Sequence, residues 1–398
     1  MSTTAPAATE VVANGILAPH PSDARRQQAM LPTVRPQNHA SNLLALPDGE
    51  LLCVWFAGTQ EGVADISIFL SRLPVGSTRW SDPVQLSSDP DRSEQNPILF
   101  LVDGVLWLIW TAQASGNQDT AVVRYRQSRD HGRNWGEIGT LFDQPGTFVR
   151  QPPHVTASGK WLLGAYYCRT RPGEKWTGNH DISVVKISED QGRSWREVAL
   201  PHSTGCVHMS IVPAGEGRLL GLFRSRWADA IYASVSEDEG ESWSAPQPTG
   251  LANNNSSIQA TALADGTLAL VFNDSSAADA LERRASLYDE IEDENRHNDR
   301  SHQLTDMPAG EARESFWGAP RAPMTVALSA DGGRSWPWRR NLDEGDGYCM
   351  SNNSMQKINR EFSYPSVTQS GDGALHISYT YFRQAIKYVR VDEAWVKS

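Results

Sequence analysis

The sequence predicts an all-β fold, a six-bladed β-propeller built from four-stranded antiparallel blades. Two observations predict it: a glycine turn followed by an apolar run recurs six times, and a second turn ending in tryptophan recurs four times in register with the first. Length alone, at 398 residues, would suggest two or three domains. Because the repeats use nearly the whole chain as one closed ring, we expect residues 1–398 to form a single domain.

The first repeat is a β-hairpin with a glycine in its turn. Glycine easily reaches the positive φ that a tight turn requires, and the residues that follow it are strand formers, as in ADGTLALVF from Ala264. The first five turn glycines are 49 to 58 residues apart, which fits one blade of about 50 residues per repeat. The six turn glycines are Gly49, Gly104, Gly159, Gly217, Gly266 and Gly373.

The second repeat is the turn Ser-x-Asp-x-Gly-x-x-Trp. Its Ser and Asp side chains can bond the backbone of their own loop, its Gly takes the tight corner, and its Trp packs into the core between sheets. A looser copy runs from Ser71 to Trp80. The four full copies begin at Ser128, Ser188, Ser236 and Ser329. They account for part of an unusual total of 14 tryptophans.

The last interval, 107 residues from Gly266 to Gly373, is long enough for a seventh blade. The fourth tryptophan turn begins 63 residues after Gly266, however, against 19 to 29 residues in the other units. The extra residues therefore lie inside blade five, and we predict a polar insertion over about 275–319. It is either a solvated loop or a lid over the propeller face. We expect the N-terminal segment 10–17 to add the outer strand that closes the ring.

Composition excludes several classes of protein. The net charge of −11 gives no electrostatic support for binding nucleic acid, and no apolar run approaches the roughly 18 residues that span a bilayer. The N-terminus has no basic start and no apolar stretch of a signal peptide, so we expect a cytoplasmic protein or a chain without its leader. The cysteines are far apart, which favours buried free thiols over disulfides. No cofactor is predicted, and a structural metal ion is left open.

The Ser-x-Asp-x-Gly-x-x-Trp turns resemble the Asp boxes, or BNR repeats, of the sialidase superfamily, and the resemblance covers nearly the whole chain. It implies a ligand site where the inner strands begin, near the propeller axis. Sialidases are known for three arginines on a substrate carboxylate, a Tyr–Glu pair and an Asp acid. The resemblance places the second and third arginines at Arg224 and Arg321, the tyrosine at Tyr364, and the acid nearest to Asp65.

Two positions depart from the sialidase pattern. His39 stands near the place of the first arginine, and His208 stands where the glutamate is expected. Without the glutamate, Tyr364 lacks the base that would activate it as a nucleophile. Two histidines at matching blade openings are instead suited to proton transfer. Two arginines still suit a sugar carboxylate, and Arg150 is a candidate to replace the lost arginine.

This altered set is similar to that of sialidase-like polysaccharide lyases, such as the enzymes that release terminal rhamnose from glucuronate. The resemblance implies β-elimination of a sugar 4-linked to a uronate. His39 or His208 would remove the C5 proton, Tyr364 would be the acid or its partner, and the arginines would neutralise the carboxylate. Two alternatives stay open: a sialidase-type glycoside hydrolase with an altered catalytic set, and a non-catalytic glycan-binding propeller. The expected partner is an anionic oligosaccharide or polysaccharide.

Other polar side chains at the blade openings are candidates to bind sugar hydroxyls, or simply to cap strands. Three tryptophans outside the Asp boxes, Trp176, Trp227 and Trp317, are candidates to stack on sugar rings or to anchor loops. The polar candidates are Gln95, Asn96, Arg150, Gln151, Asn254 and Asn255.

Overall fold

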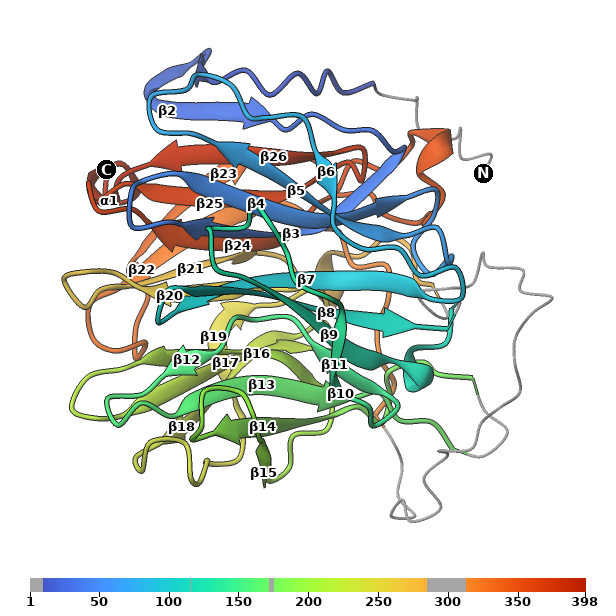
Figure 1. The fold of residues 1–398 in the computed structure, drawn as a ribbon, viewed down its shortest axis with the longest axis vertical. Coiled ribbons are helices and arrows are strands. Elements are labelled where there is room, and N and C mark those ends of the chain that lie inside the picture. Colours follow the sequence, from blue (N-terminus) through green and yellow to red (C-terminus); the bar gives the residue numbers. More distant parts are fainter. Residues whose placement is uncertain (1–9, 115, 172–174, 285–312) are drawn as a thin grey trace.

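The computed structural model describes residues 10–114, 116–171, 175–284 and 313–398, and it is a six-bladed β-propeller (Figure 1). Six antiparallel sheets follow one another along the chain, and each has four or five strands. The predicted fold class is confirmed. The described residues contain no seventh blade.

The first three blades use the chain up to residue 199. Blade one contains β3 (Gln37–Ala45), β4 (Leu51–Gly58), β5 (Ser67–Leu73) and β6 (Val84–Gln85). Blade two contains β7 (Ser93–Val102), β8 (Val105–Gln113), β9 (Val122–Ser128) and β10 (Gly139–Phe142). Blade three contains β11 (Thr147–Val149), β12 (His154–Val155), β13 (Trp161–Tyr167), β14 (Ile182–Ser188) and β15 (Arg196–Ala199).

The last three blades complete the ring. Blade four contains β16 (Cys206–Pro213), β17 (Leu219–Ser225), β18 (Ala230–Ser236) and β19 (Gln247–Ala252). Blade five contains β20 (Gln259–Ala262), β21 (Leu268–Asn273), β22 (Met324–Ser329) and β23 (Trp338–Asp343). Blade six contains β24 (Phe362–Gln369), β25 (Leu375–Tyr381), β26 (Ala385–Val391) and the N-terminal strands β2 (Asp23–Met30) and β1 (Ala18–His20).

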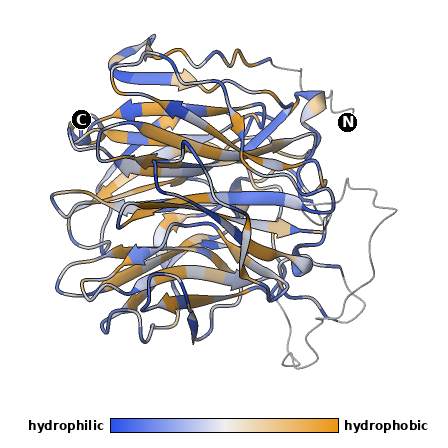
Figure 2. Ribbon diagram, in the orientation of Figure 1, coloured by the Kyte–Doolittle hydropathy of each residue, from blue (hydrophilic) through white to orange (hydrophobic). Residues whose placement is uncertain are grey.

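The turns form as the sequence predicts. All six predicted turn glycines have a positive φ, between 72° and 91°. In one Asp box, the Ser188 hydroxyl donates to Asp190 at 2.9 Å, and the Gly192 amide donates to Ser188 Oγ at 2.8 Å. The Trp195 indole donates to the Gly192 carbonyl at 3.1 Å, so the box closes on itself. Apolar residues are concentrated on the strands (Figure 2), and clusters of buried apolar side chains join neighbouring blades.

The ring is closed by the N-terminus, but not by the segment we predicted. Strand β2 pairs with β26, with Met30 opposite Lys387. Segment 10–17 instead runs beside the outer part of blade one, where the Leu17 amide donates to the Thr78 carbonyl. The prediction missed β2 because its sequence, DARRQQAM, is polar along an outer edge and gives little strand signal.

The extra residues lie in blade five, between β21 and β22, as predicted. Of the predicted insertion 275–319, the structure describes 275–284 and 313–319, and the rest lies outside the described residues. Three side chains near its end are buried: Ser315, Trp317 and Ala319. This end of the insertion packs against the propeller and is not a solvated loop.

Bulges at the blade openings control which side chains reach the site. The inner strands of blades one, two, four and six each carry one extra residue, which bends the strand and re-aims a side chain. The residues with positive φ at these bulges are Ala40, Asn96, His208 and Tyr364, with φ from 51° to 57°. His39 comes one position earlier. The two histidines therefore do not occupy matching positions, which corrects that expectation.

All four cysteines, Cys53, Cys168, Cys206 and Cys349, are buried free thiols. Short 3-10 turns lie at Gln118–Thr120, Ala277–Asp279 and Ser354–Gln356, and the α-helix α1 spans Glu393–Val396. In the part of the chain that the structure describes, no helix has the length and apolar character needed to cross a membrane.

Candidate functional site

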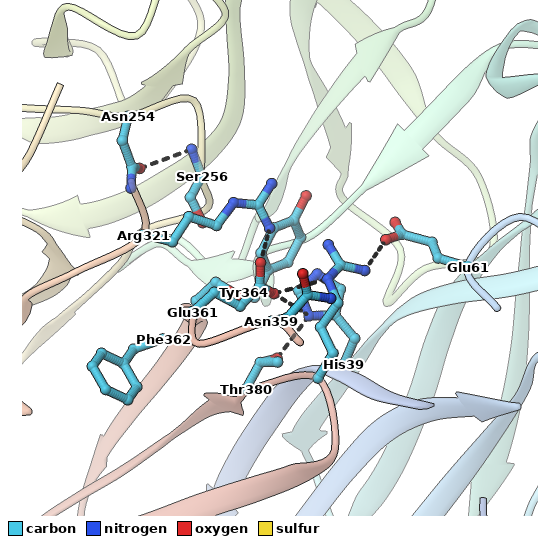
Figure 3. A network of polar contacts seen from close by, with 12 residues as sticks. His39, Glu61, Asn254, Ser256, Arg321, Asn359, Glu361, Phe362, Tyr364 and Thr380 are labelled. Carbon is cyan, nitrogen blue, oxygen red and sulfur yellow. Dashed lines mark hydrogen bonds and ion pairs between the residues drawn. The ribbon is translucent and has the colours of Figure 1, made fainter. Parts of the chain in front are cut away.

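Tyr364 lies at the centre of a buried, arginine-rich site on the propeller axis (Figure 3). The guanidinium carbons of Arg150, Arg224 and Arg321 lie 5.6, 5.6 and 5.8 Å from the centre of its ring. Arg224 Nη1 donates to Tyr364 Oη at 2.6 Å. Three cations from blades three, four and five thus surround one phenol from blade six.

Arg224 is the arginine most available to a ligand. It stands near the end of β17, opposite Val207, and its Nε donates to Asn255 Oδ1 at 2.8 Å. Its Nη2 is buried and has no hydrogen-bond partner among the described residues. Burial, together with nearby arginines, lowers the pKa of Arg224 to about 10. No carboxylate forms an ion pair with it in the described chain, so an anion would be favoured here.

Arg321 belongs to a buried chain of ion pairs. Its Nη1 lies 3.2 Å from Glu361 Oε2, and Arg383 Nε lies 2.9 Å from Glu361 Oε1. Arg383 Nη1 continues the chain to Glu61 Oε2 at 2.5 Å. Burial alone would raise the pKa of Glu361, but Arg383 and Arg321 hold it below its usual range. Glu361 and Glu61 are therefore both paired with arginines.

His39 lies on β3 at the edge of this chain (Figure 3). Its Nδ1 lies 2.8 Å from Thr380 Oγ1 and 3.8 Å from Glu361 Oε1. Its Nε2 is buried without a hydrogen-bond partner among the described residues, and the ring centre is 4.3 Å from that of Tyr364. Burial and the surrounding arginines lower the pKa of His39 well below its usual value.

His208 also packs against Tyr364, with ring centres 5.7 Å apart. Its Nε2 is hydrogen-bonded to Tyr166 Oη at 3.0 Å, and its Nδ1 has no hydrogen-bond partner among the described residues. Burial and nearby arginines lower the pKa of His208 well below its usual value. Burial raises the pKa of Tyr166 well above its usual value, so Tyr166 remains a neutral phenol.

Beside His208, an ion pair and two indoles form a wall. Arg226 donates through Nε and Nη2 to Asp181 Oδ2 at 2.9 and 2.6 Å, and Trp176 donates to Asp181 Oδ1 at 2.9 Å. The Arg226 guanidinium lies 5.3 Å from the Trp317 ring centre, and Arg224 lies 5.6 Å from the same ring. Trp317 thus packs over both arginines from the insertion in blade five.

Arg150 is bound to backbone. Its Nη2 donates to the carbonyls of Ser41, Tyr364 and Pro365 at 2.9, 3.2 and 3.3 Å. It thereby ties blade three to blades one and six across the axis. Its Nε and Nη1 have no hydrogen-bond partner among the described residues.

The other predicted polar residues divide into two groups. Asn255 reaches the site, because it binds Arg224 and donates to the Phe316 carbonyl at 2.9 Å. Asn254 donates to the Pro320 carbonyl at 2.8 Å and lines a small pocket with Arg321. Gln95 donates to Ser93 within its own strand.

The structure also places the remaining candidates. Asn96 is a buried bulge residue of blade two, and Gln151 donates to the Ile258 carbonyl at 2.5 Å. Asp65 is exposed and accepts from the Thr59 amide and hydroxyl. Trp227 packs under Arg313, at 5.2 Å, away from the arginine-rich centre.

Sequence reasoning missed Arg383, Glu361, Glu61 and Tyr166. Tyr166 was hidden in an apolar strand, and the two glutamates and Arg383 follow no motif. One signal was available for Thr380: it faces Ser363 across the bulge of blade six as Arg224 faces Val207 across the bulge of blade four. Aligning the blades by their bulges would have shown that this position points to the axis.

A larger pocket of about 770 Å³ lies elsewhere, between the turns 44–49, 73–77 and 369–372. Its histidine, His376, is hydrogen-bonded on both ring nitrogens, to Tyr388 and Ser370. Its lining residues offer no buried polar side-chain atom without a partner. Several buried donors without partners, on Arg150, Arg224, His39 and His208, lie around Tyr364 instead, and we therefore place the candidate site there. Among the described residues, no cluster of three or more His, Cys, Asp or Glu side chains is arranged to hold a metal ion.

Acid stability provides a test of the burial of His208. In the unfolded chain a histidine titrates near pH 6.5, whereas folded His208 resists protonation, so stability is present above pH 6.5 and is lost as the pH falls toward the folded pKa. Between pH 7 and pH 5, we expect the free energy of unfolding to fall less in His208→Gln than in the parent. The difference between the two slopes is up to about 1.4 kcal/mol per pH unit. Urea denaturation at several pH values measures this. His202→Gln, at an exposed histidine, is the control, and equal slopes for all three proteins would contradict the prediction.

Comparison with known proteins agrees with this fold. The model of the BNR repeat-like domain family matches residues 49–377, most of the chain. No curated protein matched the chain in a sequence search. A Hadza microbial sialidase is similar in structure, with a TM-score of 0.64, 16% identity and coverage of 90% of this chain and 66% of that one.

Two further solved structures are similar. The NanB sialidase from Streptococcus pneumoniae gives a TM-score of 0.63 at 11% identity, with 91% of this chain and 69% of that one covered. The intramolecular trans-sialidase from Ruminococcus gnavus, in complex with oseltamivir carboxylate, gives 0.64 at 12% identity, with 91% and 95% covered. The chain therefore spans about two thirds of the first two proteins. At these identities the likeness confirms the sialidase-type propeller fold.

Proposed function

The chain belongs to the BNR repeat-like domain family, and on that premise we propose that it is a carbohydrate-active enzyme that cleaves a sugar 4-linked to a uronate by β-elimination. Terminal rhamnose on glucuronate is the example of such a substrate that we would test first. The proposal rests on one observation: a set of buried polar atoms without hydrogen-bond partners surrounds Tyr364. These atoms are Arg150 Nε and Nη1, Arg224 Nη2, Arg383 Nη2, His39 Nε2 and His208 Nδ1.

Buried polar groups are rarely left unpaired, so a cluster of them favours a polar ligand that would complete their bonds. Arg150 and Arg224 carry charges matched to an anion, because neither forms an ion pair with a carboxylate among the described residues, whereas Arg321 and Arg383 are offset by Glu361 and Glu61. A sugar carboxylate fits a guanidinium fork through two parallel bonds. The neighbour from Ruminococcus gnavus holds oseltamivir carboxylate, a carboxylate ligand on the same fold.

In the proposed reaction, the arginines bind the uronate carboxylate and stabilise the negative charge that spreads onto it when C5 loses its proton. A neutral histidine takes that proton. The C5–H electron pair forms the C4=C5 double bond, the C4–O4 bond breaks, and O4 takes a proton from Tyr364. The Tyr364 oxygen is negatively charged after it gives up its proton. The hydrogen bond from the Arg224 guanidinium offsets this charge until solvent returns the proton. No water is consumed.

A sialidase-type hydrolase is the second candidate, and its support is the fold. A sialidase-type hydrolase needs a tyrosine activated by a glutamate, and an aspartic acid as the proton donor. Here the bonding partner of the Tyr364 hydroxyl is Arg224, Glu361 and Glu61 are bound to arginines, and Asp65 is exposed. This arrangement favours elimination over hydrolysis. A binding-only propeller is the third candidate.

Entry of a sugar requires the Trp317 segment to move. The pocket between Trp317, Asn255 and Arg321 has a volume of about 10 Å³, about the room that one water needs. The segment is held by hydrogen bonds from Trp317 to the Thr177 carbonyl and from the Phe316 amide to the Arg226 carbonyl. It is therefore a cover over the site, in line with the lid alternative for the insertion.

The test incubates the purified chain with a glucuronate-capped oligosaccharide and, separately, with a model sialoside. We expect growth of the ultraviolet absorbance of the unsaturated uronate, without release of sialic acid. Tyr364→Phe is expected to abolish the signal while keeping the melting temperature of the parent. Release of free sialic acid without the absorbance would overturn elimination in favour of hydrolysis. Binding of either glycan without turnover would favour the third candidate.

A further inference from the structure

We propose that the two buried histidines have different roles: His39 is the base, positioned by Glu361 and Thr380, and His208 is a neutral hydrogen-bonding group, positioned by Tyr166. This inference rests on the proposed function and deepens it, since the sequence does not order the two histidines. It follows from which neighbour each imidazole has. Among the described residues, His39 has a carboxylate neighbour, whereas the charged and aromatic groups near His208 are arginines and phenols.

A histidine that takes a proton becomes a cation. In a buried site that cation needs a carboxylate nearby, because water does not offset its charge. His39 has one: Glu361 Oε1 lies 3.8 Å from its Nδ1. The other charged groups near His39 are all arginines, namely Arg383, Arg321, Arg150 and Arg224. Among the described residues, Glu361 is the carboxylate that forms an ion pair with His39, and it can favour the protonated state.

The geometry of His39 suits a base. Its Nδ1 faces Thr380 and Glu361, which fixes the ring on one side. Its Nε2 is left without a partner, and the ring lies against Tyr364. The nitrogen without a hydrogen bond, Nε2, is thus on the side of the ring away from the carboxylate. Pairs in which a carboxylate orients a basic imidazole have the same arrangement. Glu361 does not touch substrate in this arrangement and acts through His39.

His208 lacks such a partner. The charged groups near it are Arg224, Arg226 and Arg150, and its contacting phenols are Tyr166 and Tyr364. No carboxylate forms an ion pair with His208 in the described chain, and Asp181 is bound to Arg226.

A cation at His208 would therefore face other cations. The bond to Tyr166 fixes Nε2, and the remaining Nδ1 can only offer a neutral hydrogen bond to the sugar.

The step balances as follows. His39 Nε2 takes the C5 proton, and the C5–H electrons form the C4=C5 bond as the C4–O4 bond breaks. O4 is protonated by Tyr364. His39 then returns its proton to solvent and Tyr364 regains one, so the enzyme ends unchanged. His208 gains and loses no proton.

The first experiment compares Glu361→Gln with Glu61→Gln. Both carboxylates are buried and paired with Arg383, but Glu361 is also paired with Arg321 and lies 3.8 Å from His39 Nδ1. On a glucuronate-capped oligosaccharide we expect Glu361→Gln to lower kcat about 100-fold, more than it changes KM. Glu61→Gln loosens Arg383 and is expected to act mainly on KM. Equal losses of kcat in the two variants would overturn the role of Glu361.

The second experiment uses glutamine, which is neutral and can donate a hydrogen bond. We expect His208→Gln to keep about a tenth of kcat and His39→Gln to lose about 1,000-fold or more. Thr380→Val is expected to lower kcat, and Thr380→Ser to restore most of it. A larger loss in His208→Gln than in His39→Gln would overturn the assignment while leaving the elimination reaction in place.

A third readout needs no turnover. In protein labelled with ¹⁵N-histidine, the side-chain signals are assigned from His39→Gln and His208→Gln. Glu361→Gln should shift the His39 signals and leave those of His208, and Tyr166→Phe should do the reverse. If the His39 signals do not shift in Glu361→Gln, the inference is overturned. If the shifts follow expectation but no uronate glycan is cleaved, the proposed function fails, and the base role assigned to His39 fails with it.

Discussion

Replacing Arg224 by methionine will lower kcat/KM on a glucuronate-capped oligosaccharide by about 10²–10³-fold. Arg224 supplies the one hydrogen bond that the Tyr364 hydroxyl makes in the described structure, and it also has a buried donor free for the ligand. Its removal takes away both the positive charge beside the substrate carboxylate and the stabilisation of the Tyr364 oxygen. Initial rates under limiting substrate measure the loss directly.

The matched control is Arg218→Met. Arg218 lies just before the same strand, at the opposite end, where it donates to the Ala214 carbonyl. We expect its kcat/KM to stay within twofold of the parent. Methionine has a similar length to the arginine stem, so circular dichroism should show the parent fold in both variants. A kcat/KM for Arg224→Met within a few-fold of the parent would place the carboxylate elsewhere.

The second large effect concerns stability. Asp181→Asn is expected to lower the free energy of unfolding by about 3–5 kcal/mol, because it leaves the buried Arg226 charge without its partner. The side-chain shape is nearly unchanged, and the bond from Trp176 to Oδ1 can remain. The loss of unfolding free energy therefore measures the effect of leaving the Arg226 charge without a partner. Urea denaturation at neutral pH measures it.

Asp82→Asn serves as the control, since Asp82 forms an exposed pair with Arg79 at 2.8 Å. Exposed pairs contribute about 0–1 kcal/mol, so little change is expected. The double variant Asp181→Leu with Arg226→Met should recover much of the loss, because a buried pair replaced by apolar groups is often neutral. An Asp181→Asn protein within 1 kcal/mol of the parent would contradict the prediction.

Much of the fold could be predicted because its repeats depend on local chemistry. A turn glycine and an Asp box fix their own backbone, so their spacing gave the number of blades and the place of the insertion. The closing strand could not be located in the same way. Strand β2 is polar and outermost, and what holds it is its pairing with β26, a contact between the two ends of the chain.

The site was predictable where it depended on blade position and not where it depended on long-range pairs. Arg224, Arg321 and Tyr364 meet as expected. Arg383 and Glu61 do not follow from any motif, because their ion pair joins residues 322 positions apart in sequence. The bulges also escaped notice: positive φ at His208 and Tyr364 is set by the packing of inner strands around the axis, and tyrosine, unlike histidine, is rarely found there.

The pairing of β2 with β26 also constrains how the protein is made. On the ribosome, β2 emerges before the strands of blades one to five and β26 emerges after them, so the edge of β2 that pairs with β26 stays unpaired while those blades form. An unpaired strand edge is a place where chains associate with one another. The polar, arginine-containing sequence of β2 suits that wait, since charged side chains discourage such association. The polar sequence that gave β2 little strand signal is therefore also the property that limits association during this delay.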